Sequence, residues 1–552
     1  MTRAPVAAAD PMAAQRARYS HREVQEVLGA LLLALLTAMV SSTVIATALP
    51  TIVGALGGQD QLSWVATAQL LTLTVSTPLW GKLSDLFGRK LMFQTALAVF
   101  VAGSLMAGFA PNIGELIAGR AIQGLGAGGL YSLTQVILGD IVEPRERGRY
   151  TGYTGAVFGV ATVAGPLLGG FIVDTDWLGW RWCFFVCVPL AVVAFAVLQK
   201  VLRLPRVERK ARIDWYGAGT ITAGATTLML LLSLGGQEFA WSSPWTYVLG
   251  ALSASLLVLA VIAERHAAEP ILPPRLFRNR TFVFTSIASL FVGMAMFGVM
   301  IYMPQYLQIV KGLTPTASGL MTLPMVCGML IASIGAGKAV TVTGRWKIFP
   351  AVGLLMIAGG MVLLSRLHAG SPRPIIGADL AVIGFGLGLS MQILILAAQN
   401  AVRDPDMASA TSGVAFFRAL GGATGVAAYG AILTIRLRDE LTAMLQSAHI
   451  TMPGGSGDLN LGSPKAIYQL PGPVLHIIQE SFTRAMQTVF LVGAPIALLG
   501  FLAVLALKEL PLRGERSRKR SRRVSGVAGE PATKRARRAS DPSAKVQRGT
   551  EA

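Results

Sequence analysis

The chain has 552 residues, of which 53% are hydrophobic and only 14% charged, and its formal net charge is +20 at pH 7. A soluble domain carries about 25% charged residues, so this composition excludes an ordinary soluble protein and predicts an all-α polytopic membrane protein. The three cysteines and five histidines show no metal-binding or redox spacing, and we expect neither a metal nor another cofactor.

Apolar segments follow one another along the chain, each with the roughly 20 residues that a helix needs to cross ~30 Å of hydrocarbon. Irregular runs of small residues within them favour helices over the strands of a membrane barrel. The fourteen predicted spans lie near 27–49, 62–80, 91–110, 114–139, 150–173, 182–201, 214–234, 244–263, 281–303, 317–336, 348–367, 377–400, 409–434 and 484–507.

Lys and Arg are concentrated in alternate loops. The loops at 50–61, 111–113 and 235–243 contain no Lys or Arg, whereas the loops next to them along the chain are basic. The positive-inside rule therefore predicts that both termini are cytoplasmic. We expect a multi-pass protein of the bacterial cell membrane.

The two halves of the chain look related, which is typical of secondary transporters. Gly81 to Lys90, with the sequence GKLSDLFGRK, has a weaker echo at Gly337 to Lys347, GKAVTVTGRWK. The seventh and eighth predicted spans fall between the repeats. The predicted organisation is a cytoplasmic N-terminal segment at 1–26, a six-helix bundle at 27–201, two inserted helices with flanking loops at 202–280, a second six-helix bundle at 281–510 with a long outer loop at 435–483, and a basic, disordered cytoplasmic tail at 511–552.

The loop from Gly81 to Lys90 marks a membrane surface, because its charges cannot lie in hydrocarbon. Gly81 and Gly88 allow tight turns, and Asp85 can accept hydrogen bonds from a helix N-terminus. Arg89 and Lys90 can pair with acids across the gap between the halves, which would hold the cytoplasmic side shut until those contacts break. The alternative is an ordinary basic loop. The stretch resembles the signature loop between the second and third helices of the major facilitator superfamily.

Arg120 lies within the fourth predicted span, where a charge is costly, so it should face a cavity or a partner. Gln123 is three residues further on, on the same face. The segment resembles the fourth-helix motif of the superfamily, in which the arginine is tied to proton coupling. Gly124 to Gly129 also match the dinucleotide-binding pattern GxGxxG, but no strand precedes them. Close helix packing through Gly124 and Gly128 is the better interpretation.

The fifth predicted span contains Gly165, Pro166, Gly169 and Gly170, and these residues predict close packing with a bend. In the superfamily this Gly-Pro pattern marks antiporters. The alternative is that any closely packed helix could contain it.

Two further segments resemble the fourteen-helix drug:proton antiporter branch of the superfamily, which is its multidrug efflux branch. Residues 179–189 are similar to the entry to its sixth helix, with Cys187 where that branch usually has Asn. Residues 412–425 are similar to its thirteenth helix and contain Arg418, a second deep-lying arginine that should be paired or face a cavity. The resemblance implies the major facilitator fold, with two six-helix bundles plus two inserted helices.

Ser41 departs from the pattern of this branch, which commonly has a membrane-embedded Asp at that position as a candidate for proton or cationic-drug binding. Serine cannot carry that charge change, so either coupling uses other carboxylates or the substrate range differs. Glu115 and Asp379 are our candidates for a group that titrates during transport. Glu115 lies about 140° around the helix from Arg120, so we do not expect a direct pair between them.

Aromatic and methionine side chains in and after the ninth predicted span suit a cavity for varied apolar ligands. The candidates are Phe297, Tyr302 and Met303. Positions that face lipid or pack against other helices are an equally good interpretation.

The sequence shows no catalytic constellation and no Walker loop, so we do not expect an enzyme. The resemblance implies a secondary active exporter of lipophilic drugs or toxic compounds, driven by proton entry, with small lipophilic substrates, protons and membrane lipid as partners. Export of an endogenous lipid or metabolite is one alternative. Another is a non-transporting receptor or scaffold whose tail, with 13 Lys or Arg against 4 acids, binds anionic lipid or nucleic acid. The placement of the basic residues argues against nucleic acid.

Overall fold

The computed structural model of the chain describes residues 21–56, 62–142, 146–175, 177–202, 214–235, 239, 241–267, 270–448, 467–468 and 470–511. All the named elements within these residues are helices. The predicted N-terminal segment lies mostly outside the described residues, and the predicted basic tail lies almost wholly outside them.

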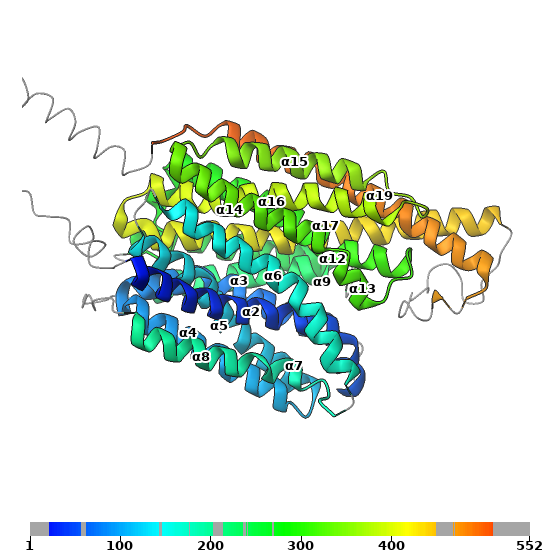
Figure 1. Cartoon of the computed structure of the whole chain (residues 1–552), viewed down its shortest axis with the longest axis horizontal. Helices are drawn as coiled ribbons and strands as arrows, with labels where there is room; N and C mark the ends of the chain where they lie inside the picture. The colour runs from blue at the N-terminus through cyan, green and yellow to red at the C-terminus, as the bar shows by residue number, and fades with distance from the viewer. Residues whose placement is uncertain are drawn as a thin grey trace, which may run out of the picture.

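The helices fall into three groups along the chain (Figure 1). The first group comprises α2 (His21–Leu56), α3 (Leu62–Phe87), α4 (Arg89–Phe109), α5 (Ile113–Ile141), α6 (Arg147–Asp174), α7 (Trp182–Phe185) and α8 (Cys187–Val201). The pair α9 (Trp215–Leu234) and α10 (Pro244–His266) follows. The last group comprises α11 (Pro274–Phe277), α12 (Arg280–Ile309), α13 (Pro315–Leu320), α14 (Leu323–Thr343), α15 (Ile348–Leu364), α16 (Arg373–Ala401), the short 3₁₀ helix η2 (Asp404–Asp406), α17 (Met407–Ser447) and α19 (Gly472–Leu505).

Each of the fourteen predicted spans coincides with helical structure, although two of them are divided, between α7 and α8 and between α13 and α14. Within the described residues, ten helices are long and apolar enough to cross a membrane. The all-α architecture is therefore confirmed. The other apolar helices are shorter or more polar, so the number of fourteen crossings stays a prediction.

The predicted long outer loop at 435–483 is shorter in the structure. α17 continues to Ser447 and α19 already begins at Gly472. The two helix ends pack together through Leu441, Leu445 and Ile478, which bury apolar surface that a loop would expose.

Helix ends lie at residues whose chemistry suits them. Asn112, Asp214 and Asn279 each accept a hydrogen bond from a backbone N–H in the first turn of α5, α9 and α12. α14 ends at Gly344 with φ 71°, and α4 follows Gly88 with φ 94°, a conformation that glycine adopts without steric penalty.

Close packing through glycine holds the first group of helices together. Gly124 and Gly128 on α5 face α3, and a Cβ on Gly128 would lie 2.5 Å from the carbonyl oxygen of Leu73. Gly126 faces α4 instead, where a Cβ would lie 2.6 Å from the carbonyl oxygen of Ala96. α5 therefore sits between α3 and α4 at a distance that a larger side chain would not permit.

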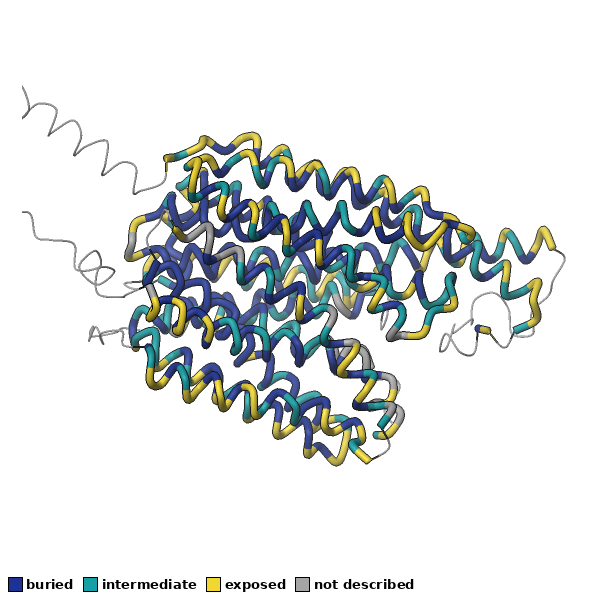
Figure 2. Tube along the Cα trace, viewed as in Figure 1, coloured by how far each residue is buried: buried dark blue, intermediate teal, exposed yellow. Residues whose placement is uncertain are grey.

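The helices form two bundles. In the first, α5 packs on α3 and α4, and α2 packs on α6 and α8; in the second, α12 packs on α17, α16 packs on α14 and α15, and α19 packs on α15. The bundles meet where α6 packs on α14 and where α3 packs on α17. Buried positions line the inside of both bundles, and exposed positions follow the outer helices (Figure 2).

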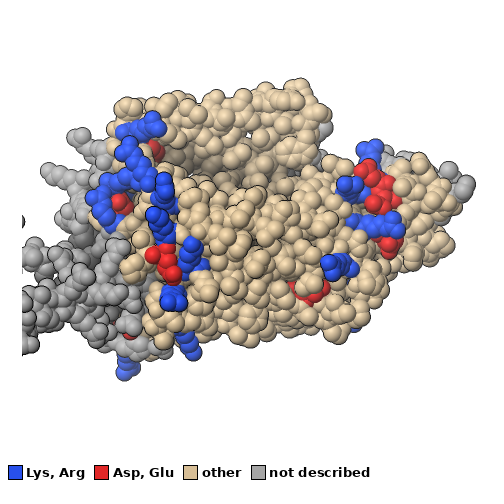
Figure 3. Space-filling model, turned by 90° about the horizontal axis from the view of Figure 1, so that it is seen from above, with Lys and Arg blue, Asp and Glu red and all other residues tan. Residues whose placement is uncertain are grey.

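The outer surface has an apolar zone between two charged ends. Lys, Arg, Asp and Glu gather towards both ends of the molecule, and the wide zone between them carries other residues (Figure 3). Large apolar side chains such as Phe171, Val192 and Ile331 are exposed on the helices. Apolar surface of this extent on the outside of a helix bundle is what contact with lipid requires.

The predicted loop from Gly81 to Lys90 is helical in the structure except at Gly88, because α3 continues to Phe87 and α4 begins at Arg89. The two bundles touch closely at the end of the molecule where α3 meets α4, which we call the loop end. A Cβ on Gly81 of α3 would lie 2.9 Å from the Cβ of Ser412 on α17. Nearby, the Gln135 side-chain amide of α5 donates to Gln392 Oε1 of α16 at 3.3 Å, and Gln399 Nε2 donates to the Gln135 carbonyl at 3.4 Å. Small and neutral polar groups therefore close this end.

We expect Gly81→Val to separate the bundles at the loop end, because overpacking costs about 1–3 kcal/mol. In a background without the three native cysteines, a Gln135→Cys probe should then react with a water-soluble maleimide about fivefold faster or more. Gly335→Val on α14, where a Cβ would meet no neighbouring group within 4 Å, is the matched control. Equal labelling rates in the two variants would contradict this account of the closed end.

Candidate functional site

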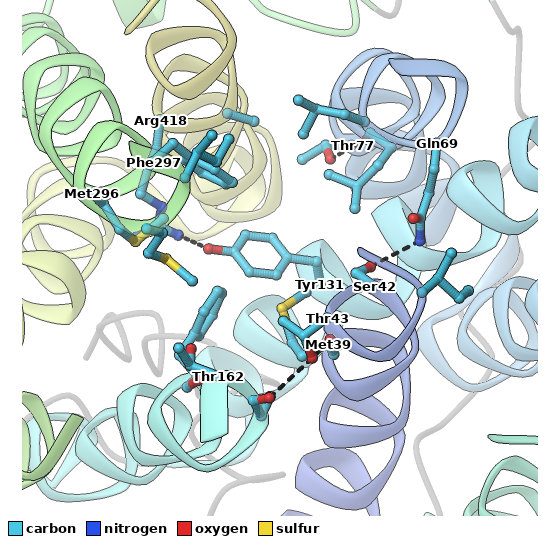
Figure 4. Close-up of a pocket in the computed structure, with 18 of the residues that line it drawn as sticks. Met39, Ser42, Thr43, Gln69, Thr77, Tyr131, Thr162, Met296, Phe297 and Arg418 are labelled. Carbon is cyan, nitrogen blue, oxygen red and sulfur yellow. Dashed lines mark hydrogen bonds between the residues drawn. The ribbon is translucent and has the colours of Figure 1, made fainter. Parts of the chain in front are cut away.

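A cavity of about 320 Å³ lies between the two bundles (Figure 4). Its walls come from α2, α3, α5 and α6 of the first bundle and from α12 and α17 of the second. On α2, α3 and α12 the lining residues lie towards the end remote from the loop end, and on α6 they lie near the middle. On α17 they lie in the third of the helix nearest the loop end, one turn beyond Ser412. Packed inter-bundle contacts therefore close the cavity on the loop-end side.

The wall of the cavity is mainly apolar, with a few hydroxyl and amide groups. The apolar lining residues include Met39, Leu73, Phe158, Met296, Phe297 and Met300. Gln69 Nε2 donates to Ser42 Oγ at 2.9 Å, and Thr43 Oγ1 donates to the Ala161 carbonyl at 3.0 Å (Figure 4). These bonds tie α2 to α3 and to α6, so the polar wall groups also fix the helices that carry them.

Arg120 lines the cavity and is 4% exposed, as expected of an arginine that must face a cavity or partner. Its Nη1 donates to Gln123 Oε1 at 2.9 Å and its Nε donates to the Val65 carbonyl at 3.3 Å. The Gln123 amide donates in turn to Ser41 Oγ at 2.9 Å and to Ser104 Oγ at 2.8 Å. Ser41 is thus an acceptor in a neutral network that orients Arg120.

Arg418 also lines the cavity, is 2% exposed and reaches from α17 across to the first bundle. Its guanidinium donates to the hydroxyl of Tyr131 on α5 and to the Met391 carbonyl on α16, the latter at 3.3 Å. Figure 4 shows Arg418 beside Tyr131, and the guanidinium carbon lies 5.4 Å from the centre of the Tyr131 ring. The same ring packs edge-on against Phe158. This is a polar contact between the bundles at the cavity wall.

The signature loop forms a charge cluster within the first bundle. Arg89, the first residue of α4, pairs with Asp85 Oδ1 at 2.6 Å and with Asp140 Oδ2 at 2.7 Å. It also donates to Ser84 Oγ at 2.5 Å, while Lys90 Nζ donates to the Gln199 carbonyl of α8 at 2.8 Å.

These contacts correct the expectation that Arg89 and Lys90 pair with acids of the other half. The turn at Gly88 places Arg89 between the ends of α3 and α5, so its acidic partners belong to its own bundle. Asp85 was also expected to accept hydrogen bonds from a helix N-terminus, but in the structure it forms an ion pair with the Arg89 side chain. Gly81, not a charge, makes the close approach to α17.

The two carboxylates proposed to titrate lie outside the cavity wall. Glu115 is exposed at the start of α5, where its N–H donates to Asn112 Oδ1 and its Oε1 accepts from Asn112 Nδ2, both at 2.9 Å. Asp379 is 7% exposed on α16 and does not line the cavity. The structure therefore brings neither of them to Arg120.

The glycines of α6 serve inter-helix packing. A Cβ on Gly165 would collide with Thr43 of α2, and a Cβ on Gly159 would lie 2.8 Å from Val326 of α14. Gly169 is buried and Gly170 is half-buried, and α6 runs without interruption through Pro166. α6 is thus held between α2 of its own bundle and α14 of the other.

Of the proposed cavity residues on α12, Phe297 lines the cavity and Tyr302 and Met303 do not. Tyr302 donates to the Val426 carbonyl at 2.6 Å, and Met303 is fully buried in the core of the second bundle. The prediction that Tyr302 and Met303 line the cavity is therefore wrong. Their positions on α12 direct them towards neighbouring helices.

Sequence reasoning missed Tyr131. It stands eleven residues after Arg120, about three helical turns, and so lies on the same face of α5. That spacing could have identified it. The lining residues of α2 and α3 carry no comparable signal.

Comparison with known proteins agrees with this architecture. The family model of the Major Facilitator Superfamily matches residues 31–426. An uncharacterized MFS-type transporter of Mycobacterium tuberculosis is 39% identical over 465 residues, which are 84% of this chain and 66%, just under two thirds, of that protein. The multidrug transporter protein MdtP of Bacillus subtilis is 34% identical over 491 residues, covering 85% of this chain and 90% of that protein.

A solved structure shares the fold. The proton:xylose symporter XylE aligns with a TM-score of 0.58 at 15% identity, over 90% of this chain and 98% of the other. At that identity the likeness concerns the fold alone. The match to the family model and the Bacillus subtilis relative show that the chain belongs to the Major Facilitator Superfamily, a family of multi-pass membrane transporters and not of enzymes.

Proposed function

We propose that this chain is a secondary active exporter of lipophilic small molecules, from the fourteen-helix drug:proton antiporter branch. The observation that carries this proposal is the mainly apolar cavity between the two bundles, which is closed at the loop end by packed contacts. A cavity of about 320 Å³ is within the size range of sites for drug-sized ligands. The name of the Bacillus subtilis relative, a multidrug transporter, favours export of foreign compounds over uptake of a nutrient.

Transport would proceed by alternating access. The contacts of Gly81 with Ser412 and of Gln135 with Gln392 and Gln399 must break for the loop end to open. Neutral hydrogen bonds each contribute only about 0.5–1.5 kcal/mol, so such a closure can be reversed without a large barrier. The Arg89 cluster stays within the first bundle and would move with it as a rigid unit.

The basic loops support a proposed orientation with both termini in the cytoplasm of a bacterial cell. In that orientation the loop end faces the cytoplasm, and packed contacts close the cavity on that side. The basic residues of the tail would then lie beside the anionic inner leaflet, where each contributes about 1 kcal/mol of attraction.

Proton entry is the proposed driving force, and Asp379 is the stronger of the two carboxylate candidates. It is buried within α16, whereas Glu115 is exposed and engaged with Asn112 in a helix cap. An ionisable residue inside a membrane-spanning helix is a functional candidate by default. Because Asp379 does not line the cavity, its protonation would act through the packing of α16 against α14 and α15. Arg120 and Gln123 are proposed to couple that change to the cavity through their network with Ser41 and Ser104.

Purified full-length protein in vesicles with an acidic interior should accumulate at least one dye from a panel of anionic, neutral and cationic lipophilic dyes. Removing the buried charge with Arg120→Ala should lower the initial rate by about tenfold or more, since hydrogen bonds to charged groups contribute about 1.5–3 kcal/mol. Arg366→Gln, which changes an exposed arginine outside the cavity, is the control and should transport normally. If the wild-type protein moved no dye under the pH gradient, the proposed function would be wrong.

Asp379→Asn should abolish accumulation against a gradient and leave downhill exchange of the same dye intact, because only the coupling step needs the carboxylate. Glu115→Gln should reduce accumulation by no more than about twofold, since it removes only a surface cap interaction. Both activities are measured in the same vesicles with and without the pH gradient. A double variant that still accumulates dye as the wild type does would exclude both carboxylates.

A further inference from the structure

The charge of the cavity wall has one sign. Among the described residues that line it, Arg120 and Arg418 are the charged ones, and none is an Asp or Glu. Guanidinium groups stay protonated in proteins, so the wall carries two positive charges. Within the described part of the chain, their hydrogen-bond acceptors are carbonyls, an amide and a phenol, all of them neutral.

Arg120 and Arg418 differ from most buried arginines in their hydrogen-bond partners. A buried arginine is normally paired with a carboxylate, because an uncompensated charge in a poorly polarisable environment is strongly unfavourable. Arg89 follows that rule with Asp85 and Asp140. Arg418 is more deeply buried than Arg89, and its hydrogen bonds to the described residues go to the Tyr131 hydroxyl and the Met391 carbonyl, which are neutral.

The two arginines stand at different positions along the cavity. Arg120 and Tyr131 share a face of α5 and are about 16 Å apart along its axis. Arg418 is located at the Tyr131 position by its hydrogen bond, on the side nearer the loop end. Apolar side chains of α2, α6 and α12, among them Met39, Phe158 and Met296, complete the wall.

We propose that the exported substrates are amphiphilic anions whose acidic group binds Arg418 and whose apolar body lies against the methionine and phenylalanine side chains. The inference rests on the proposed function and narrows its substrate class. A carboxylate can accept two parallel N–H bonds from a guanidinium, and such charge-assisted bonds are roughly twice as strong as neutral ones. A cationic amphiphile would meet two like charges and no acid among the described residues of the same wall.

Binding of the anion would also loosen the contact between the bundles. Tyr131 belongs to α5 and Arg418 to α17, so their hydrogen bond joins the two halves at the cavity wall. A substrate carboxylate competes for the same guanidinium N–H group, and its charge makes it the stronger acceptor. Exchange of the phenol for the carboxylate removes one inter-bundle bond at the moment when the cavity is filled.

A matched set of probes with one apolar body and three head groups tests the proposal: pyrenebutyrate, pyrenebutanol and pyrenebutylammonium. Binding to the purified full chain is measured by energy transfer from its tryptophans. The wild type should bind the carboxylate about tenfold or more tightly than the ammonium, because a bond to a charged group contributes about 1.5–3 kcal/mol.

Variants at the two ends of the inter-bundle bond should act in opposite directions. Arg418→Gln should weaken carboxylate binding about tenfold or more and leave alcohol binding unchanged, whereas Arg418→Lys should keep part of the preference. Tyr131→Phe keeps the charge and removes the competing phenol, so carboxylate binding should become about two- to tenfold tighter. Arg366→Gln, at an exposed position just after α15, is the control for loss of a positive charge elsewhere.

The proposal is overturned if the wild type binds the ammonium as tightly as the carboxylate, or if Arg418→Gln keeps the carboxylate preference. An unchanged carboxylate affinity in Tyr131→Phe would overturn the exchange step even if Arg418→Gln failed to fold. Export of the alcohol or ammonium without anion preference would contradict this inference and leave the proposed function standing. Anion-selective binding without gradient-driven transport would contradict the proposed function and leave this inference standing.

Discussion

The contact of Arg418 with Tyr131 is the interaction on which the centre of this structure depends. It places a guanidinium from the second bundle against a phenol of the first, at a cavity whose wall is mainly apolar. An arginine there is tolerated only if neutral acceptors or a cavity compensate its charge. The buried guanidinium of Arg418 therefore accounts for three features. These are the position of the cavity, the polar contact between the bundles and the positive charge of the cavity wall.

Steric fit and charge have separate roles at the loop end. Arg89 ties the ends of α3, α4 and α5 into one unit through Asp85 and Asp140, and its bonds need not change when the bundles move. The approach of Gly81 to Ser412 depends instead on the absence of a side chain. A closure made of van der Waals contact and neutral amides is weaker per contact than ion pairs across the gap, which suits a structure that must open and close.

Much of the architecture could be predicted because membrane helices leave a direct record in sequence. Their backbone groups must be satisfied within each segment, so length and hydropathy locate them without knowledge of their neighbours. The predictions for Arg120 and Gln123 rested on the same local logic, since a charge within an apolar span must have a cavity or partner. The packing of Gly124 and Gly128 against α3 likewise follows from residue size and helical spacing.

What the sequence determined by itself were the helical segments, the small-residue packing faces and the presence of two arginines that needed compensation. Only the tertiary structure decided which groups compensate them, because Tyr131 and Arg418 are 287 residues apart and meet through the packing of two bundles. For the same reason only the structure shows that Arg89 pairs with Asp140 on α5 of its own bundle, and that Tyr302 and Met303 do not line the cavity. Spacing along one helix specifies which side chains share a face, but the helix opposite that face is chosen by the packing of the whole molecule.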